Sequence, residues 1–412
     1  MGRAKNANVV FVLIVLVLST MGIGLVTPVL PFLIESFCDG NVAEASRYVG
    51  IFGAAYAAMQ FLFAPIVGAL SDRFGRRVVL LVSLLGASLD YCLLALAPTL
   101  EWFFLGRIVA GVTGASFSAA MAYIADVTPP EERAKKFGLA GAALGAGFVL
   151  GPALGGLLAG VHLRAPFLVA AGLSALNLAY GFFVLPESLA PEHRREFDIR
   201  RANPLGSLRR LAESPVLVGF AATLLFALIA QFGVQSVWAL YTEQCFGWLP
   251  LQVGISLAVV GVTTGIAQGW LVGLTTRWIG EHQSVLLGLL FCVVSFVGIG
   301  VATEEWMLYA FVMLFALSGI VGPSIQSLLS REVGPSEQGE LQGSITSLQS
   351  VALMLGPLSG TYLFAHYAPV DAVPHAPAVP FYAAALLDVL AIVIALRLFA
   401  QVRARKAPVG HG

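Results

Sequence analysis

The sequence predicts an all-α membrane protein that crosses the bilayer twelve times. Of its 412 residues, 58% are hydrophobic and only 11% are charged, whereas soluble proteins carry about 25% charged residues. A membrane-spanning helix needs about 20 predominantly apolar residues, and twelve runs of that size follow one another along the chain. The net charge is zero, so the composition gives no reason to expect a nucleic acid as partner.

The expected helices fall into two groups of six. The longest polar stretch, 187–214, separates the sixth from the seventh, so we expect an N-terminal bundle at 1–186, a linker at 187–214 and a C-terminal bundle at 215–412. Two such pseudo-symmetric halves are typical of secondary transporters. The twelve expected helices cover residues 8–36, 46–70, 78–98, 102–125, 137–161, 165–185, 215–241, 250–273, 283–302, 306–330, 341–365 and 378–401.

Lys and Arg gather in every second loop. The loops of the opposite set hold only Arg47 and Arg164. Because cytoplasmic loops carry an excess of positive charge, both termini are expected in the cytoplasm. The even number of helices gives the same answer independently.

The segment 68–81, GALSDRFGRRVVLL, forms a short charged turn between the second and third spans. Glycine supplies the backbone freedom for a sharp turn, and arginines hold the turn on one side of the bilayer. Asp72 would favour a helix N-terminus in the other half by charge–dipole attraction. An ordinary charged loop is the alternative. The gating candidates of this turn are Gly68, Asp72, Arg73, Gly75, Arg76 and Arg77.

Glycines are concentrated in the fifth span. Small residues allow helix backbones to approach closely, and a proline inside a helix permits a bend. We therefore interpret this span as a surface on which the two halves close or slide. Its gating candidates are Gly147, Gly151, Pro152, Gly155 and Gly156.

Charges deep inside an apolar span are functional candidates, because an unpaired charge in the membrane costs several kcal/mol. Asp90 and Arg107 lie at similar depths on neighbouring spans, so an ion pair between them is feasible. A paired carboxylate stays ionised, whereas an unpaired buried one can take up and release a proton. Asp90 therefore has either a transport role or a purely structural one. Asp388, near the middle of the last span, is the second proton-coupling candidate.

Neutral polar side chains recur at helical spacing in several spans. Such stripes can bond one helix to another; together, amides and aromatic rings favour a wet cavity for an amphipathic molecule. With Arg107, the substrate-binding candidates are Tyr56, Gln60, Gln231, Gln235, Trp238, Thr264, Gln268, Gln342 and Thr346.

Three motifs together resemble those of the major facilitator superfamily. They are the turn at 68–81, Arg107-x-x-x-Gly111-x-x-Gly114 in the fourth span, and Gly147-x-x-x-Gly151-Pro152-x-x-Gly155-Gly156 in the fifth. Within the superfamily, nearly the whole chain is similar to the bacterial tetracycline exporters. The stretches that carry this likeness include MGIGLVTPVLPFL (21–33), YAAMQFLFAP (56–65), GASLDY (86–91), YTEQCFGW (241–248), GELQGSITSL (339–348) and GPLSG (356–360).

The resemblance implies a secondary active transporter of the inner (plasma) membrane that works by alternating access. It would export an amphipathic, tetracycline-like compound in exchange for protons, as a monomer and without a cofactor of its own, although a divalent cation such as Mg²⁺ can travel with the substrate. It also implies that Asp72 meets the start of the eleventh span, near 339–343, as a latch.

The chain departs from the exporters at three polar positions. Ser19 and Cys292 stand where the family has Asp, and Thr264 stands where it has His. These departures keep an alternative open, a uniporter or symporter of a small metabolite. A receptor or scaffold would need a large soluble domain or tail that the sequence lacks, and no nucleophile–base set or phosphate loop points to an enzyme.

Overall fold

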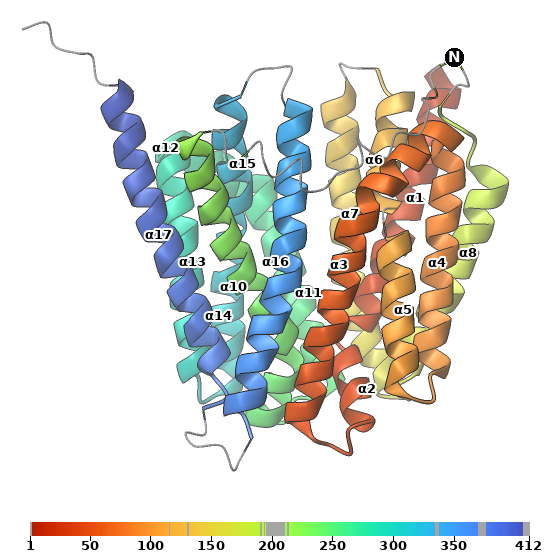
Figure 1. Cartoon of the computed structure of the whole chain (residues 1–412). Helices are drawn as coiled ribbons and strands as arrows, with labels where there is room; N and C mark the ends of the chain where they lie inside the picture. Colours follow the sequence, from red (N-terminus) through yellow and green to blue (C-terminus); the bar gives the residue numbers. More distant parts are fainter. Residues whose placement is uncertain are drawn as a thin grey trace, which may run out of the picture. The chain divides into compact units, whose positions relative to one another are not determined.

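A computed structural model describes residues 2–114, 116–129, 132–189, 192, 194, 211, 214–333, 338–369 and 376–406 (Figure 1). Within these residues the chain forms helices and no strands. The helices are α1 (Gly2–Val26), α2 (Leu30–Ser36), α3 (Val42–Phe74), α4 (Arg76–Leu96), α5 (Leu100–Thr113), α6 (Ser116–Val127), α7 (Arg133–Ala159), α8 (Ala165–Val184), α10 (Pro215–Phe246), α11 (Pro250–Ile266), η3 (Ala267–Leu271), α12 (Val272–Trp278), α13 (Glu281–Val301), α14 (Glu305–Leu317), η4 (Ser318–Ile320), α15 (Val321–Arg331), α16 (Gln338–Tyr367) and α17 (Val379–Lys406).

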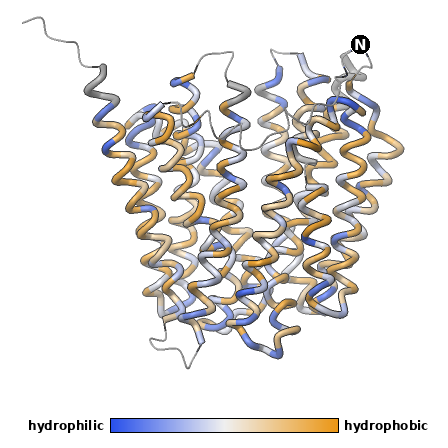
Figure 2. The backbone as a smooth tube through the Cα atoms, in the orientation of Figure 1, coloured by the Kyte–Doolittle hydropathy of each residue, from blue (hydrophilic) through white to orange (hydrophobic). Residues whose placement is uncertain are grey.

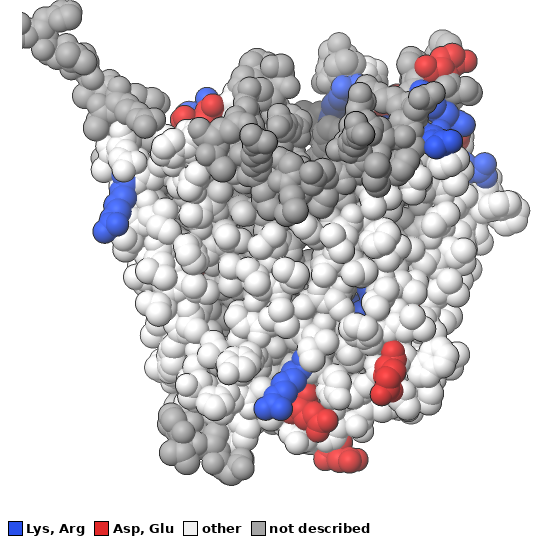
Figure 3. Space-filling view, viewed as in Figure 1, with Lys and Arg blue, Asp and Glu red and all other residues white. Residues whose placement is uncertain are grey.

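The twelve-span layout is confirmed. Eleven segments of the described chain are long and apolar enough to cross a membrane. The twelfth expected span, 102–125, corresponds to α5 and α6, which flank residue 115, a position outside the described residues. In Figure 2 the helices are hydrophobic along most of their length, and Figure 3 shows charged side chains mainly near helix ends. The chain is therefore a multi-pass membrane protein.

Three of the expected spans are interrupted, which the apolar runs did not predict. The span 8–36 breaks at 27–29, between α1 and α2, where Pro31 occupies the first turn of the new helix. A proline is tolerated there because its missing N–H would have no partner. The span 250–273 contains the π turn η3, and the span 306–330 contains the 3₁₀ turn η4. Hydropathy cannot detect such interruptions because they leave the composition apolar.

The helices pack into two compact units, each of which is described by itself. Unit 1 comprises Met1–Pro204 and Trp238–Val262, and unit 2 comprises Leu205–Val237 and Thr263–Gly412. The end of α10 and most of α11 thus pack with the first six spans. The expected division at a linker, 187–214, stays a prediction, since most of that segment lies outside the described residues.

In unit 1, α1 and α7 pack with their backbones almost in contact. A Cβ atom on Gly151 would lie 2.7 Å from the Cα of Gly24, and one on Gly155 would lie 2.8 Å from the carbonyl carbon of Leu25. Real Cβ contacts are not that short, so only glycine allows this approach. Gly156 meets Pro250 of α11 in the same manner.

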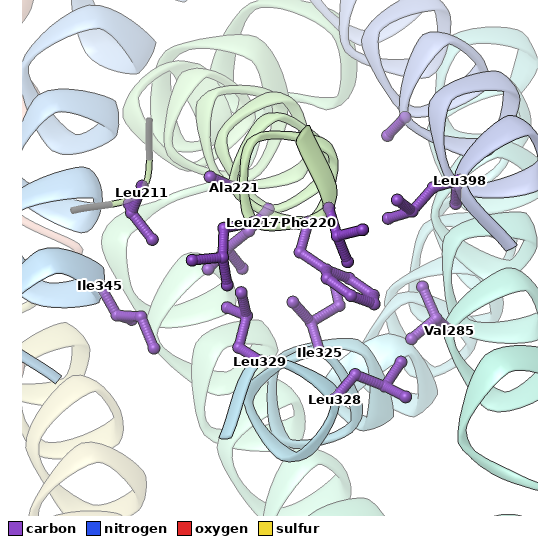
Figure 4. Packing of buried hydrophobic residues seen from close by; sticks show 14 of the residues in the cluster. Leu211, Leu217, Phe220, Ala221, Val285, Ile325, Leu328, Leu329, Ile345 and Leu398 are labelled. Atoms are coloured by element: carbon purple, nitrogen blue, oxygen red, sulfur yellow. The ribbon is translucent and has the colours of Figure 1, made fainter. Parts of the chain in front are cut away.

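Unit 2 contains a matching helix pair and, separately, an aliphatic core. A Cβ atom on Gly360 of α16 would lie 2.8 Å from the Cα of Gly233 of α10. Elsewhere in this unit, side chains of α10, α13, α15, α16 and α17 fill the space between helices (Figure 4). The residues at its centre include Leu217, Phe220, Val285, Ile325, Leu329 and Leu398.

Candidate functional site

The charged turn between α3 and α4 is held by an acid from another part of unit 1. Gly75 adopts a φ of 105°, and the backbone N–H groups of Arg76 and Arg77 donate to the two oxygens of Glu187, at 2.8 Å and 3.3 Å. A Cβ atom on Gly75 would lie 2.6 Å from the carboxyl carbon of Glu187. Gly75 is therefore required both by the conformation of the turn and by the close approach of Glu187. We call the hydrogen bonds from the Arg76 and Arg77 N–H groups to Glu187 the Glu187 clamp.

Arg76 joins the turn to α6. Its guanidinium pairs with Asp72 at 2.6 Å and with Asp126 at 3.2 Å, and Ser188 donates to the same Asp126 oxygen at 3.0 Å. Arg73 lies over the ring of Phe74, and Gly68 has open space where a side chain would be. Asp72 is thus occupied by an ion pair inside unit 1. Its expected latch to 339–343 stays a prediction.

The ion pair between Asp90 and Arg107, which the sequence left as one of two alternatives, is formed. The Arg107 guanidinium donates to one Asp90 oxygen, and the two side chains are only 15% and 3% exposed. Gly106 makes room for the pair, because a Cβ there would lie 2.7 Å from the other Asp90 oxygen. The pairing brings opposite charges together, which lowers the cost of burying each of them, although the other Asp90 oxygen and the Arg107 Nε lack hydrogen-bond partners within the described residues.

Two further substrate-binding candidates lie beside this ion pair. The Arg107 guanidinium lies 6.0 Å from the ring centroid of Tyr56, within cation–π range. Gln60 donates to the Tyr56 hydroxyl at 3.4 Å and to the Gly114 carbonyl at 3.5 Å. The structure therefore gathers Tyr56, Gln60, Asp90 and Arg107 into one polar cluster, which we call the ion-pair cluster.

Unit 2 contains a cavity of about 150 Å³. Three of the expected polar side chains line it: Gln231 of α10, Thr264 of α11 and Gln268 of η3. Cys292 of α13 and Ser318 of η4 line it as well, together with apolar side chains such as Leu228 and Phe315. We call this space the unit 2 pocket. Its lining combines neutral polar groups with aliphatic and aromatic surface, as ligand sites do.

The remaining substrate-binding candidates lie elsewhere. Gln235 is exposed and is not part of the pocket lining. The buried indole of Trp238 donates to Ser256 at 2.9 Å and packs edge-on against Trp248. Gln342 accepts from Gln326 at 2.7 Å, and the Thr346 hydroxyl donates to the Gln342 carbonyl at 2.9 Å. The roles of these four residues in substrate binding stay predictions.

Asp388 lies in unit 2, away from the pocket surface. Its side chain is buried in α17, which packs against α13. Within the described part of the chain, neither carboxyl oxygen has a hydrogen-bond partner. The two intramembrane acids thus have opposite surroundings, one paired and one unpaired.

Sequence reasoning missed the roles of Glu187, Asp126 and Cys292. Glu187 was assigned to the linker, although its carboxylate holds the turn 75–77. Both acids follow apolar spans directly, which is the only local signal. Cys292 was interpreted as a lost acid, whereas the structure places it in the wall of the unit 2 pocket. No spacing within one span reveals such contacts between distant helices.

Helices that cross a membrane many times, around a pocket lined by neutral polar and apolar groups, are typical of membrane carriers for small molecules. The sequence profile of the Major Facilitator Superfamily matches residues 12–357 and 236–411. The chain belongs to this superfamily, as its motifs indicated.

Several relatives are similar over most of the chain. It is 43% identical to the class C tetracycline resistance protein of Escherichia coli over 365 residues, which cover 88% of this chain and 91% of that protein. It is 38% identical to the class G tetracycline resistance protein of Vibrio anguillarum, over 87% and 91% of the two chains. The crystal structure of the human organic anion transporter MFSD10 superposes with a TM-score of 0.70 at 26% identity, covering 95% of this chain and 99% of that chain.

Proposed function

We propose that this protein exports a tetracycline-like amphipathic compound across the inner membrane in exchange for protons, by alternating access. The observation that supports this most strongly is the similarity to tetracycline resistance proteins of several classes, at 34–43% identity over about 88% of the chain. These relatives favour a transporter over an enzyme. A monomer with both termini in the cytoplasm is part of the proposal.

The substrate would be held by the neutral polar groups of the unit 2 pocket. The ion-pair cluster of unit 1 is a separate expected binding region. A cavity of about 150 Å³ is smaller than the 300–1,000 Å³ typical of sites for drug-sized ligands. In the conformation described here, the unit 2 pocket therefore accommodates only part of such a molecule. A divalent cation such as Mg²⁺ would enter with the substrate. Proton coupling would use Asp90, Asp388 or both.

The test uses the purified full chain in liposomes with an imposed pH gradient and a panel of tetracyclines. We expect accumulation of at least one tetracycline, accompanied by proton movement in the opposite direction. Tetracycline flux without proton movement would indicate a facilitator. If no tetracycline moves while a metabolite or an organic anion does, the proposed substrate class is wrong.

The latch at Asp72 is tested in the same liposomes. Because Asp72→Asn removes the charge that would attract a helix N-terminus, we expect slower turnover with unchanged insertion in the membrane. Wild-type turnover would argue against the latch.

A further inference from the structure

The unit 2 pocket lies where two membrane spans depart from the α-helical path. The π turn η3 interrupts one of these spans and the 3₁₀ turn η4 interrupts the other. Gln268 of η3 lines the pocket, as do Ser318 and Gly319 of η4. A Cβ atom on Gly319 would lie 3.2 Å from Cγ2 of Thr264 and 3.8 Å from Nε2 of Gln268, so the two interrupted segments meet at this pocket. Turns of this kind inside helices are frequent at functional sites.

Three polar side chains of this pocket make no hydrogen bond within the described structure. Gln231, Thr264 and Gln268 line the pocket, and none of the three has a side-chain hydrogen bond to another described residue. By contrast, the hydroxyl of Thr275, on the same span as Thr264, donates to the carbonyl oxygen of Leu271 at 2.9 Å. Each glutamine amide offers one acceptor and two N–H donors, and the threonine hydroxyl can do both. The pocket therefore presents donors and acceptors that are available to water or to a ligand.

The rest of the pocket lining is uncharged and partly apolar. None of the described residues that line it is Asp, Glu, Lys, Arg or His, and Leu228, Leu289 and Phe315 add aliphatic and aromatic surface. An ionised group in such a space would lose its hydration without gaining an opposite charge. A purely apolar group would leave the two amides unsatisfied. The lining therefore favours an uncharged polar group that is attached to an apolar body.

A primary carboxamide fits this combination better than a hydroxyl group does. It presents a donor and an acceptor side by side, as the glutamine side chains themselves do, so two amides can bond to each other reciprocally. A hydroxyl group donates only one hydrogen bond. The volume of the pocket, about 150 Å³, exceeds the space of one water molecule, about 30 Å³ in the liquid, and is smaller than the 300 Å³ or more of typical drug sites. The pocket therefore takes one end of a larger molecule.

We propose that the unit 2 pocket is a carboxamide site, in which Gln231 and Gln268 bind the amide of the substrate and Thr264 adds a hydroxyl. The apolar part of the lining contacts the ring that carries the amide. This inference rests on the proposed function and names the part of the substrate that the pocket takes. Tetracyclines carry a primary carboxamide at one end of their fused rings, which agrees with a pocket too small for the whole molecule.

Binding of a small amide is measured without transport. For the full chain in detergent, millimolar benzamide should raise the midpoint of thermal unfolding by about 2 °C, because a ligand that binds only the folded state stabilises it. Benzoate carries a charge in place of the amide and benzyl alcohol carries a hydroxyl group, so each should raise the midpoint by less than about 0.5 °C. An equal rise with all three compounds would overturn the assignment to a carboxamide. No rise with benzamide would overturn the site.

Matched variants locate the binding of benzamide. Gln231→Met combined with Gln268→Met nearly conserves side-chain volume and should abolish the rise in the midpoint. Gln349→Met changes an exposed glutamine of α16 outside the pocket lining and should keep the full rise. Thr264→Val removes one hydroxyl at almost constant shape and should reduce the rise, which provides a test if the double variant does not fold. A full rise in the double variant or in Thr264→Val would contradict the proposed site.

Transport in liposomes should discriminate at the same chemical group. We compare tetracycline with the analogue whose carboxamide is dehydrated to a nitrile, a group that accepts hydrogen bonds but donates none. The wild-type protein should move tetracycline at least about tenfold faster, because a site built to hydrogen-bond a substrate group rejects the analogue that lacks it. In the double variant of Gln231 and Gln268, the two rates should agree within about threefold. The same ratio of rates in both proteins would contradict recognition of the amide by these glutamines.

The two measurements distinguish failure of the proposed function from failure of this inference. If the wild-type protein moves no tetracycline, but benzamide raises the unfolding midpoint only when Gln231 and Gln268 are present, the proposed substrate class is wrong and the carboxamide site stands. If tetracycline is exchanged for protons, but benzamide leaves the midpoint unchanged and the nitrile is moved equally well, the proposed function stands and the carboxamide site is wrong.

Discussion

The two units build the same helix contact from the same short motif. In unit 1, Gly151-Pro152-x-x-Gly155 of α7 packs on α1, and in unit 2, Gly356-Pro357-x-x-Gly360 of α16 packs on α10. Both contacts bring backbone to backbone, which only glycine permits. The backbone plan is thus repeated, while the polar groups mounted on it are different.

Unit 1 neutralises its buried acid, and unit 2 does not. Asp90 is paired with Arg107, whereas both oxygens of Asp388 lack partners within the described residues. A fixed pair stabilises one arrangement of the helices, and an unpaired acid can change its charge. The comparison teaches that one unit holds its buried acid in an ion pair, whereas the other leaves its buried acid without one.

The turns repeat the same contrast. Gly75 between α3 and α4 and Gly280 between α12 and α13 both have positive φ, 105° and 81°. Glu187 fills the space beside Gly75, whereas the space beside Gly280 is open within the described structure. The backbone of the turn is common to both units, and the clamp belongs to unit 1.

The largest difference in stability between the two units is expected when the partner of the paired acid is removed. Arg107→Ala leaves Asp90 buried with an uncompensated charge, which is expected to reduce the free energy of unfolding by about 3–5 kcal/mol. Asp388→Asn removes no ion pair and should change it by less than about 1 kcal/mol. Denaturant unfolding in detergent measures both. Adding Asp90→Asn to Arg107→Ala should recover part of the loss, and equal losses in the two single variants would refute the contrast.

The shared helix contact predicts similar losses in the two units. Gly155→Ala pushes α7 away from α1, and Gly360→Ala pushes α16 away from α10. Each variant is expected to lower the free energy of unfolding by about 1–3 kcal/mol. Gly145→Ala on α7 meets open space and gains about 0.5–1 kcal/mol from helix propensity. The midpoint of thermal unfolding in detergent reports all three. A lower unfolding midpoint for only one of the two variants would mean that the motif stabilises the helix contact in one unit but not in the other.

The two turns should differ in their tolerance of a side chain. Alanine at either glycine is strained by about 1–3 kcal/mol, because a positive φ with an extended ψ is essentially restricted to glycine. Gly75→Ala also displaces Glu187 from two backbone donors, which adds about 1–3 kcal/mol. We therefore expect a larger drop in stability for Gly75→Ala than for Gly280→Ala, measured by the same unfolding assay. Equal drops would show that the clamp contributes nothing.

The smallest effect on stability is expected in the pocket. Gln268→Ala removes one amide from the pocket wall and should change the free energy of unfolding by less than about 0.5 kcal/mol. It should alter the ratio of transport rates between two tetracyclines by about 3- to 10-fold, because a lost polar contact discriminates between substrates. Val262→Ala on exposed surface of α11 is the control. An unchanged ratio of transport rates would indicate that Gln268 contributes to helix packing and not to substrate binding.

The fold was accessible from the sequence because a bilayer imposes strict rules on length and composition. Twelve apolar runs and three motifs predicted the architecture, and matching depths predicted the pair of Asp90 and Arg107. The breaks at 27–29 and 267–271 were missed because they depend on local hydrogen bonding. The clamp by Glu187 was missed because it joins residues 111 positions apart in the sequence.

The Glu187 clamp also determines where the chain can be divided for engineering. Its carboxylate ties the residues just after α8 to the turn at 75–77, and the backbone N–H of Leu189 donates to the same side chain at 3.1 Å. A split version of the protein, produced as two separately encoded fragments, should therefore be cut beyond Leu189. A cut before Glu187 would place this residue on the second fragment. The first fragment would then fold without the hydrogen bonds that Glu187 makes to the turn at 75–77.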